Sequence, residues 1–337
     1  MMIFNKLYKK IFSRFSSNKI IVLMYHRVVN KIGDPWQLAV SPANFELQLA
    51  MLRKNFTIIS VNELILQISQ KKIKKKCICL TFDDAYTDNF LFAQPLLEKY
   101  NCPATFFVPT NFINANKPFW WDVLEELILR SPSLPLKLSL SIKGKNYSFN
   151  LKKQTITKDE FNEQNSWSYK EEPPTERCKL YLEVCALFRP FSEKEVDFYL
   201  QQIKEWAGYQ IKLVYDSAMS FIQLTQLSNN PLFSVGVHTC THVDLNCHTI
   251  SEQQLQIMDC AKHLKFQYKN FVNAIAYPFG SYNKSTLAIV KQQGISVGFT
   301  TNSGFINKHS KSYELDRFEV CNISGEKLLS QLLTTLQ

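Results

Sequence analysis

Short runs of apolar, β-branched and aromatic residues recur along the chain, and they predict buried strands. These runs occupy residues 19–28, 77–85, 102–110, 232–240, 274–280 and 295–304. Segments of helical period lie between most of them, at residues 42–54, 61–69, 87–100, 120–130, 251–268 and 283–293. Strands that alternate with helices build parallel βαβ units, and parallel strands buried on both faces have continuous apolar sequences. The pattern therefore predicts an α/β fold.

The alternation of strands and helices breaks in one long segment. Apolar and polar residues alternate there around Gly144, which predicts a hairpin. Further on, Ser192 and Glu195 form a capping-box pattern, and Gly208 is suited to end the helix that they begin. We interpret this segment as an inserted α+β subdomain. The expected division has three parts: a basic segment at 1–18, a larger fold at 19–130 and 214–330, and the insertion at 131–213.

The composition is that of a folded protein with a sizeable core. Hydrophobic residues make up 45% of the 337 residues and charged residues 20%. The nine cysteines are odd in number, and most lie within apolar runs and without zinc-finger spacing. They predict buried free thiols in a reducing compartment rather than a disulfide framework or a cysteine metal site.

The chain carries a net charge of +10, and its N-terminus is basic. In residues 1–18, apolar side chains recur at helical spacing opposite Lys and Arg, which is typical of a helix on an anionic membrane surface. The alternative is a chain end that packs locally. The sequence has neither the pattern of a secretory signal nor an apolar run long enough to cross a bilayer. We expect a cytoplasmic protein, peripheral at the inner membrane face if residues 1–18 bind lipid, with no nucleic-acid partner because no motif supports one.

Polar residues stand where several predicted strands end. Asp83 and Asp84 end one strand, His238 ends another, residues 278–282 end a third, and His26 ends the first. In a β/α barrel the carboxyl ends of the strands meet on the face where active sites are built. We therefore expect these side chains to lie together.

Adjacent carboxylates repel each other, and the sequence offers ligands for a cation that would offset the repulsion. Asp83 and Asp84 precede the loop after their strand, where two neighbouring side chains can reach one ion. His238 and His242 lie one turn apart if their segment is helical. Two imidazoles and one carboxylate leave positions on zinc open, which is typical of a catalytic site. Taken alone, such a His pair is more often a surface or core feature.

Three motifs in this order resemble those of the NodB-homology polysaccharide deacetylases, carbohydrate esterase family 4. They are "LTFDDAY" at 80–86, "HTCTH" at 238–242 and "AYPFGSYN" at 276–283. Supporting matches in "VLMYHRV", "FWWD" and "ELDRFEV" look like a bacterial subgroup associated with surface-polysaccharide synthesis. The resemblance covers residues 19–130 and 214–325.

The resemblance implies a distorted (β/α) barrel of the NodB-homology type with a metal-dependent site. Asp83 would act as general base, the backbone N–H of Phe279 would help to stabilise the oxyanion, and Tyr282 would contact the substrate. One divalent metal, Zn²⁺ in the first place and Co²⁺ or Ni²⁺ as alternatives, would be held by Asp84, His238 and His242.

The sequence departs from the family pattern at two places. Ile275 replaces the family's Arg before the proline of the third motif, and Arg317 is the candidate residue that orients Asp83 instead. The family's late Leu-x-His motif is missing, and His26 is the candidate general acid in its place, as in a permuted branch of the family. The alternative for His26 is a core histidine at a strand end.

Trp120 and Trp121 open a predicted helix. Aromatic faces suit pyranose rings, so the pair is a candidate wall of the substrate site, although such a pair is more often part of a core. Together these observations lead us to expect a hydrolase that removes N-acetyl groups from amino sugars of a surface polysaccharide or its lipid-linked precursor. Two alternatives remain: a catalytically weak glycan-binding module on the same barrel, and hydrolysis of a non-sugar amide.

Overall fold

The computed structural model describes residues 18–115, 117–211 and 216–335. It consists of two compact units, each described here by itself. The barrel unit contains the residues up to Asn30, Leu38–Asn114 and the residues from Met219 on, and the insertion unit contains Lys31–Gln37 and Ala115–Ala218. The expected insertion falls inside the insertion unit. The expected amphipathic segment at 1–18 lies, except for Asn18, outside the described residues.

An eight-stranded sheet forms the centre of the barrel unit, and all its pairings are parallel. Seven strands follow the order β11-β10-β9-β6-β5-β1-β12, and β4 pairs with the first half of β5. Helices cover this sheet, so its apolar side chains are buried almost throughout. The strands are β1 Ile20–Tyr25, β4 Thr57–Ile59, β5 Cys77–Phe82, β6 Ala104–Val108, β9 Phe233–Val237, β10 Phe271–Ala276, β11 Val297–Phe299 and β12 Phe318–Glu319.

The segment between β11 and β12 crosses the gap between the two ends of this sheet. Ile306 forms a bridge with Ile20 of β1, and Leu315 forms one with Phe299 of β11. The sheet is therefore a curled barrel that single bridges close, which confirms the predicted distorted (β/α) barrel. A separate short pair, β2 Arg27–Val28 and β3 Ala39–Val40, follows β1.

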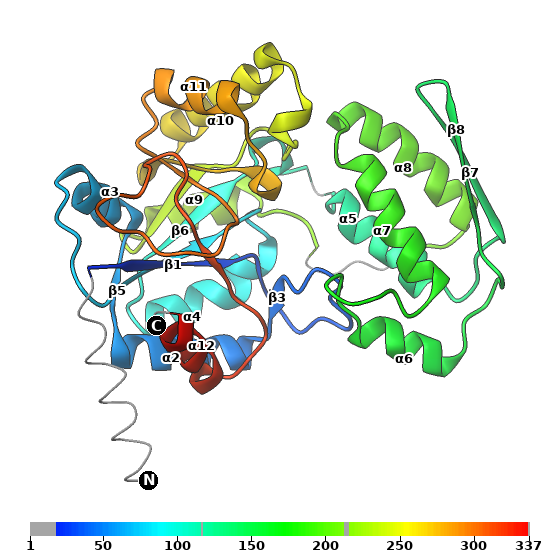
Figure 1. Cartoon of the computed structure of the whole chain (residues 1–337), viewed down its shortest axis with the longest axis horizontal. Coiled ribbons are helices and arrows are strands. Elements are labelled where there is room, and N and C mark those ends of the chain that lie inside the picture. Colours follow the sequence, from blue (N-terminus) through cyan, green and yellow to red (C-terminus); the bar gives the residue numbers. More distant parts are fainter. Residues whose placement is uncertain (1–17, 116, 212–215, 336–337) are drawn as a thin grey trace, which may run out of the picture. The chain divides into compact units, whose positions relative to one another are not determined.

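The helices of the barrel unit lie on both sides of the sheet. In Figure 1, α2, α4 and α12 lie together on one side of β1, while α10 and α11 lie on the other. Side chains cap several of them, and the Thr249–Glu252 capping box begins α10. The bounds are α2 Pro42–Asn55, α3 Val61–Ser69, η1 Asn89–Ala93, α4 Gln94–Lys99, η2 Thr110–Phe112, α9 Phe221–Asn229, η4 Leu245–Cys247, α10 Ile250–Gln267, η5 Pro278–Gly280, α11 Lys284–Gln292 and α12 Gly325–Thr335.

The insertion unit packs helices against one hairpin around a core of its own. The hairpin turns at Gly144, whose φ is +80°, and the Ser192–Glu195 capping box begins α8, which ends at Gly208 with φ +58°. All three features confirm sequence predictions. The elements are α5 Trp120–Glu125, η3 Glu126–Arg130, β7 Lys137–Ile142, β8 Lys145–Asn150, α6 Lys158–Ser166, α7 Glu176–Phe188 and α8 Glu193–Ala207.

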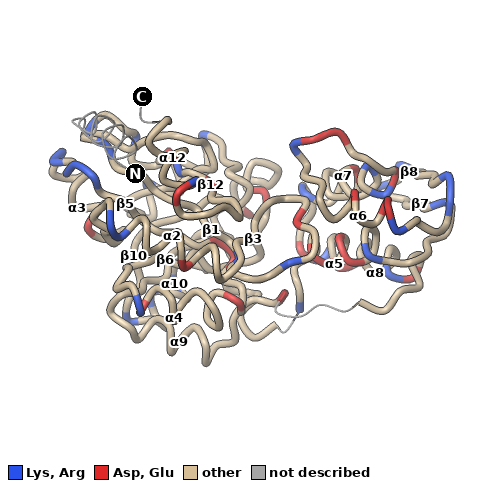
Figure 2. The backbone as a smooth tube through the Cα atoms, turned by 90° about the horizontal axis from the view of Figure 1, so that it is seen from below, with Lys and Arg blue, Asp and Glu red and all other residues tan. Residues whose placement is uncertain are grey.

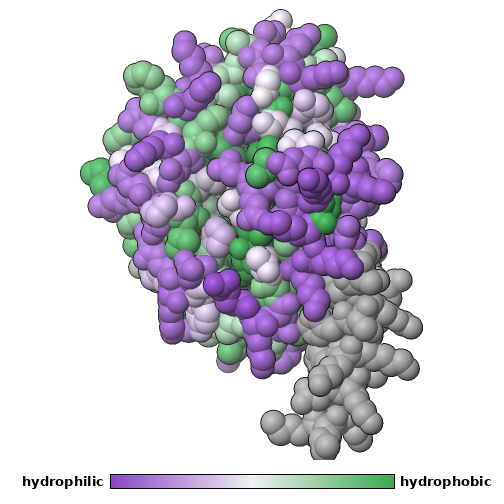
Figure 3. Space-filling view, turned by 90° about the vertical axis from the view of Figure 1, so that its left-hand side faces the viewer, coloured by the Kyte–Doolittle hydropathy of each residue, from purple (hydrophilic) through white to green (hydrophobic). Residues whose placement is uncertain are grey.

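The face of the molecule in Figure 3 is mainly hydrophilic. Lys71, Lys72 and Lys74–Lys76 form an exposed turn between α3 and β5, where Figure 2 shows a basic stretch. On the face in Figure 3 hydrophobic atoms appear as separate spots among hydrophilic ones. Among the described residues, no helix is long and apolar enough to cross a membrane. All nine cysteines are free, and six of them are buried, as the composition predicted.

Candidate active site

The polar residues that follow the barrel strands lie at the carboxyl ends of those strands. Asp83 and Asp84 follow β5, His238 follows β9, Pro278 follows β10, and His26 follows β1. Strand β5 pairs with both β1 and β6, and β9 pairs with both β6 and β10. The parallel register therefore places all these residues at one end of the barrel, as the sequence predicted.

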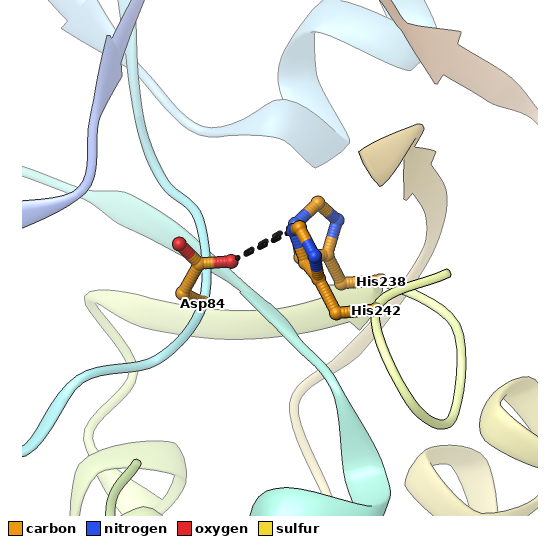
Figure 4. Close-up of side chains that lie close together, drawn as sticks. All are labelled: Asp84, His238 and His242. Atoms are coloured by element: carbon orange, nitrogen blue, oxygen red, sulfur yellow. Dashed lines mark ion pairs between the residues drawn. The ribbon is translucent and has the colours of Figure 1, made fainter. Parts of the chain in front are cut away.

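Asp84, His238 and His242 converge in a buried cluster (Figure 4). The Nε2 atoms of His238 and His242 lie 3.3 and 3.1 Å from the same oxygen, Oδ1 of Asp84. The ligand atoms of the three residues all lie within 4.8 Å of one another. Among the described residues no other group of this kind is found, so the cluster is the candidate metal site of this part of the chain.

The segment that carries the two histidines is a turn and not the turn of helix considered from the spacing. Thr239 and His242 have φ angles of +63° and +52°, in the left-handed region. Gln256 of α10 holds the turn, because its Oε1 accepts hydrogen bonds from the backbone N–H groups of Cys240 and Thr241 at 2.9 and 3.0 Å. The imidazoles therefore meet because of this turn, and helical spacing does not bring them together.

The hydrogen bonding of His238 leaves the nitrogen that faces Asp84 available to a cation. Its Nδ1 lies 2.8 Å from the carbonyl oxygen of Ala276, which can only accept, so Nδ1 carries a hydrogen. The Nε2 atom then faces Asp84 with its lone pair unless a proton or metal is bound. A hydrogen bond from the other ring nitrogen, like this one, orients histidines that bind metals. One carboxylate and two imidazoles fit a divalent cation such as Zn²⁺.

The electrostatics of the cluster keep the carboxylate of Asp84 ionised. Burial raises the pKa of Asp84, but His242 and His238 outweigh burial and lower this pKa well below its usual range. Burial lowers the pKa of His238, and its contact with Asp84 more than offsets this, so the net pKa is raised. The pKa of His242 is lowered, because burial dominates there. A negative charge thus persists between the two imidazoles.

Asp83 is held by a buried arginine. Arg317, which is fully buried, donates from Nη1 to Oδ1 of Asp83 at 2.8 Å and from Nη2 to Oδ2 at 2.7 Å. The Nε of Arg317 donates to the carbonyl oxygen of Thr300 at 3.0 Å. Burial raises the pKa of Asp83, but the Arg317 guanidinium outweighs it, so the pKa is lowered. Ile275, at the position where the family has Arg, is buried in β10.

The remaining expected barrel residues lie around these groups. His26 is half-buried, and its charge contributes to lowering the pKa of both Asp83 and Asp84, after burial and the larger partners. The ring of Phe279 meets that of His242 edge-on at 4.6 Å between centroids. Tyr282 donates its hydroxyl to Glu314 at 3.1 Å and packs against Tyr277.

Trp120 and Trp121 belong to the insertion unit. Trp121 is 7% exposed and stacks on Phe119 at 4.7 Å between ring centroids. Trp120 is half-buried and packs against the core of the insertion unit near Phe188. The environment of Trp121 favours the core alternative, while Trp120 keeps part of its surface exposed.

Strained backbone marks the same end of the barrel. Besides Thr239 and His242, the non-glycine residues Asp84 and Phe279 have φ angles of +70° and +57°. Such conformations cost about 1–3 kcal/mol each and cluster at functional sites. Sequence reasoning did not predict these backbone conformations, since φ depends on the surrounding fold.

The barrel and its buried Asp–His–His cluster beside an arginine-bound carboxylate define a class of protein, the barrel hydrolase with a candidate metal centre. The polysaccharide deacetylase family model matches residues 70–131 and 201–298. The chain belongs to the polysaccharide deacetylase family, whose members are hydrolases of carbon–nitrogen bonds other than peptide bonds.

One curated relative is similar in sequence to this chain, and two solved structures share its fold. The chain is 24% identical over 304 residues to YxkH of Bacillus subtilis, which is named as a candidate polysaccharide deacetylase; the match covers 90% of this chain and 71% of YxkH. The fold matches the deacetylase PplD of Streptococcus pyogenes, solved with acetate, with a TM-score of 0.54, 23% identity and coverage of 93% and 97% of the two chains. It also matches the polysaccharide deacetylase BC0361 of Bacillus cereus, with a TM-score of 0.57, 19% identity and coverage of 93% and 69%.

Proposed function

We propose that the protein is a metal-dependent hydrolase that removes N-acetyl groups from amino sugars of a surface polysaccharide or its precursor. The observation that carries this proposal is the convergence of Asp84, His238 and His242 next to Asp83, which Arg317 keeps ionised. A carboxylate that is held ionised and oriented, next to a cation site, suits a general base that activates water. Zn²⁺ is the proposed metal, with Co²⁺ and Ni²⁺ as alternatives.

The reaction divides among the residues of the barrel end as follows. A bound divalent cation would supply Lewis acidity toward the amide carbonyl and lower the pKa of water. Asp83 takes a proton from the attacking water, whose oxygen bonds to the carbonyl carbon. The backbone N–H of Phe279 donates to the carbonyl oxygen as negative charge develops there. The C–N bond then breaks, His26 gives a proton to the leaving amine, and acetate and the free amino sugar result.

Substrate contacts beyond the acetyl group are proposed for Tyr282 and Trp120. Tyr282 lies four residues after Pro278, which follows β10, and Trp120 keeps part of its ring exposed.

The alternatives of a glycan-binding module and a hydrolase of a non-sugar amide use the same barrel. A binding module would still bind glycan after loss of Asp83, and a non-sugar hydrolase would not deacetylate amino sugars. The predicted cytoplasmic location and the contact of residues 1–18 with anionic lipid remain proposals.

Metal content and deacetylation, measured together, test the proposal. Purified protein is analysed by mass spectrometry for metal, and acetate release is measured with N-acetylated amino-sugar oligosaccharides. The double variant Asp84→Ala, His238→Ala should lose both the metal and acetate release. His263→Ala is the matched control, because His263 is an exposed histidine on α10 outside the cluster. A folded wild-type protein that binds no divalent metal after reconstitution would contradict the proposal.

A further inference from the structure

Hydrogen bonds hold the backbone of His26 on both sides. The N–H of Asp83 donates to the carbonyl oxygen of Tyr25 at 3.0 Å, immediately before His26. The carbonyl oxygen of His26 itself accepts from the side-chain amide of Asn89 at 2.8 Å. Asn89 is fully buried, so this contact is shielded from water. The peptide groups that set the direction of the His26 side chain are therefore tied to the segment that carries the two acids.

Asp88 holds the two residues that follow His26. Its Oδ1 accepts from the backbone N–H of Val28 at 2.9 Å, and its Oδ2 accepts from Nε of Arg27 at 2.8 Å. The same Asn89 amide that binds His26 also donates to Oδ1 of Asp88 at 2.8 Å. Asp88, Asn89 and Arg27 are each at most 2% exposed. One buried network thus connects residues 26–28 to residues 88–89.

The energetics of this network point away from stability as its main role. Burial raises the pKa of Asp88, although Arg27 opposes this, which means that burying the carboxylate carries a desolvation cost. A buried ion pair is often no more stabilising than apolar residues of the same volume, but it does specify one geometry. The guanidinium of Arg27 also lies over the ring of Tyr86 at 4.4 Å, which orients it further. The π-helix η1 begins at Asn89, and such irregular turns are frequent at functional sites.

We propose that Asn89 and Asp88 are positioning residues that align His26 with the leaving amine of the substrate. This inference rests on the proposed function, in which His26 is the proton donor. The segment from Asp83 to Asn89 then contains the general base, one metal ligand and the two residues that position the general acid. Since proton transfer needs alignment, a small displacement of His26 slows C–N cleavage while leaving metal binding and substrate binding unchanged.

Two substrates with different leaving groups test the inference. An N-acetylated amino-sugar oligosaccharide releases a basic amine that needs a proton, whereas 4-nitrophenyl acetate releases a phenolate that needs none. Asn89→Leu removes the amide donor at nearly constant volume. It should lower kcat for the oligosaccharide about 100-fold with KM unchanged, and leave ester hydrolysis and metal content near wild type. His26→Ala should show the same selective loss.

The matched control is Gln164→Leu in the insertion unit. Gln164 is also a fully buried amide, and it donates to the carbonyl oxygen of Leu129 at 3.0 Å. This variant should keep the wild-type ratio of amide to ester hydrolysis. Asp88→Asn, which preserves shape, is the second test variant in case Asn89→Leu does not fold, and it should lower the same ratio.

Three results would overturn the inference alone. Wild-type amide turnover in a folded Asn89→Leu or Asp88→Asn variant would exclude a positioning role, and an equal loss of amide and ester turnover with loss of metal would indicate a purely structural one. If His26→Ala lowered both activities equally, His26 would not be the proton donor. Failure of the metal-loaded wild-type protein to release acetate from any N-acetylated amino sugar would instead overturn the proposed function, and the inference with it.

Discussion

Arg317 binds both carboxylate oxygens of Asp83 from a segment 234 residues further along the chain. The planar guanidinium matches the carboxylate and fixes its orientation. Arg317→Lys keeps the positive charge but removes the pair of N–H donors that binds both carboxylate oxygens. We therefore expect kcat to fall about 10- to 100-fold with metal content unchanged. Steady-state kinetics and metal analysis of the variant check this. A kcat equal to that of the wild type would show that Asp83 needs no such partner.

Metal should stabilise the barrel unit through the Asp84–His238–His242 cluster. Because the ligands come from the ends of β5 and β9, bound metal links two parts of the sheet, and a ligand present at 100 times its Kd adds about 2.7 kcal/mol to stability. Chelator-treated protein should therefore show a higher Tm when Zn²⁺ is added, and Asp84→Asn should not. His309→Ala, at an exposed histidine, serves as the control. The absence of any Tm shift in the wild type would contradict the metal site.

Gly280 should be required for the loop that carries Phe279. Its φ is +64°, and an added Cβ would collide with the side chain of Thr301. Gly280→Ala should destabilise the protein by about 1–3 kcal/mol, measured by urea unfolding. Gly294→Ala isolates the backbone contribution, because Gly294 has φ +68° and open space around it. Equal losses in the two variants would mean that the Thr301 contact does not matter.

The two tryptophans should separate into a core residue and a surface residue. Trp121→Ala leaves a cavity in the insertion unit and should cost about 3–5 kcal/mol of unfolding free energy. Trp120→Ala should be milder for stability and, if its exposed part stacks on a sugar, should raise KM. Thermal unfolding and kinetics with an oligosaccharide distinguish the two effects. An unchanged KM for Trp120→Ala would exclude it from the substrate site.

The capping box of α8 should contribute stability that depends on pH. The hydrogen bond from Lys143, together with those from Ser192, outweighs burial and lowers the pKa of Glu195 to about 2. Because this folded-state pKa lies below the unfolded value of about 4.3, the ionised carboxylate stabilises the fold above pH about 4.3, and this contribution is lost as pH falls toward about 2. Glu195→Gln should be less stable than the wild type at pH 7, by less than about 1 kcal/mol, since the pair is partly exposed. The difference in unfolding free energy between the wild type and Glu195→Gln, measured by urea unfolding, should shrink toward pH 3. A difference that does not change with pH would exclude the ionic contribution.

The sequence was sufficient for the main elements and for the end of the barrel that carries the site. Continuous apolar runs predicted β1, β5, β6 and β9, because parallel strands under helices are buried on both faces. Capping residues and glycines predicted the hairpin at Gly144 and helix α8, because these signals act locally. The motifs placed Asp83, Asp84, His238 and His242 at strand ends, and the strand ends of a parallel barrel meet. Strands β4 and β12 were not predicted, since two- or three-residue strands carry weak local signals. Helix α12 was also not predicted, although its leucines recur at helical spacing.

Only the tertiary structure decided which residues contact one another inside the site. The pairing of Arg317 with Asp83 joins segments far apart in the chain: the sequence offered Arg317 as a candidate, and only packing decided that it binds both carboxylate oxygens. The turn that brings His238 and His242 together depends on Gln256 from α10, and the buried network of Asp88 and Asn89 around His26 appears only when β1 lies beside β5. Local sequence thus determined the elements and their ends, because capping, turn and periodicity signals act over a few residues. The contacts that tune charge and orient side chains depend on packing between distant segments, which no local pattern encodes.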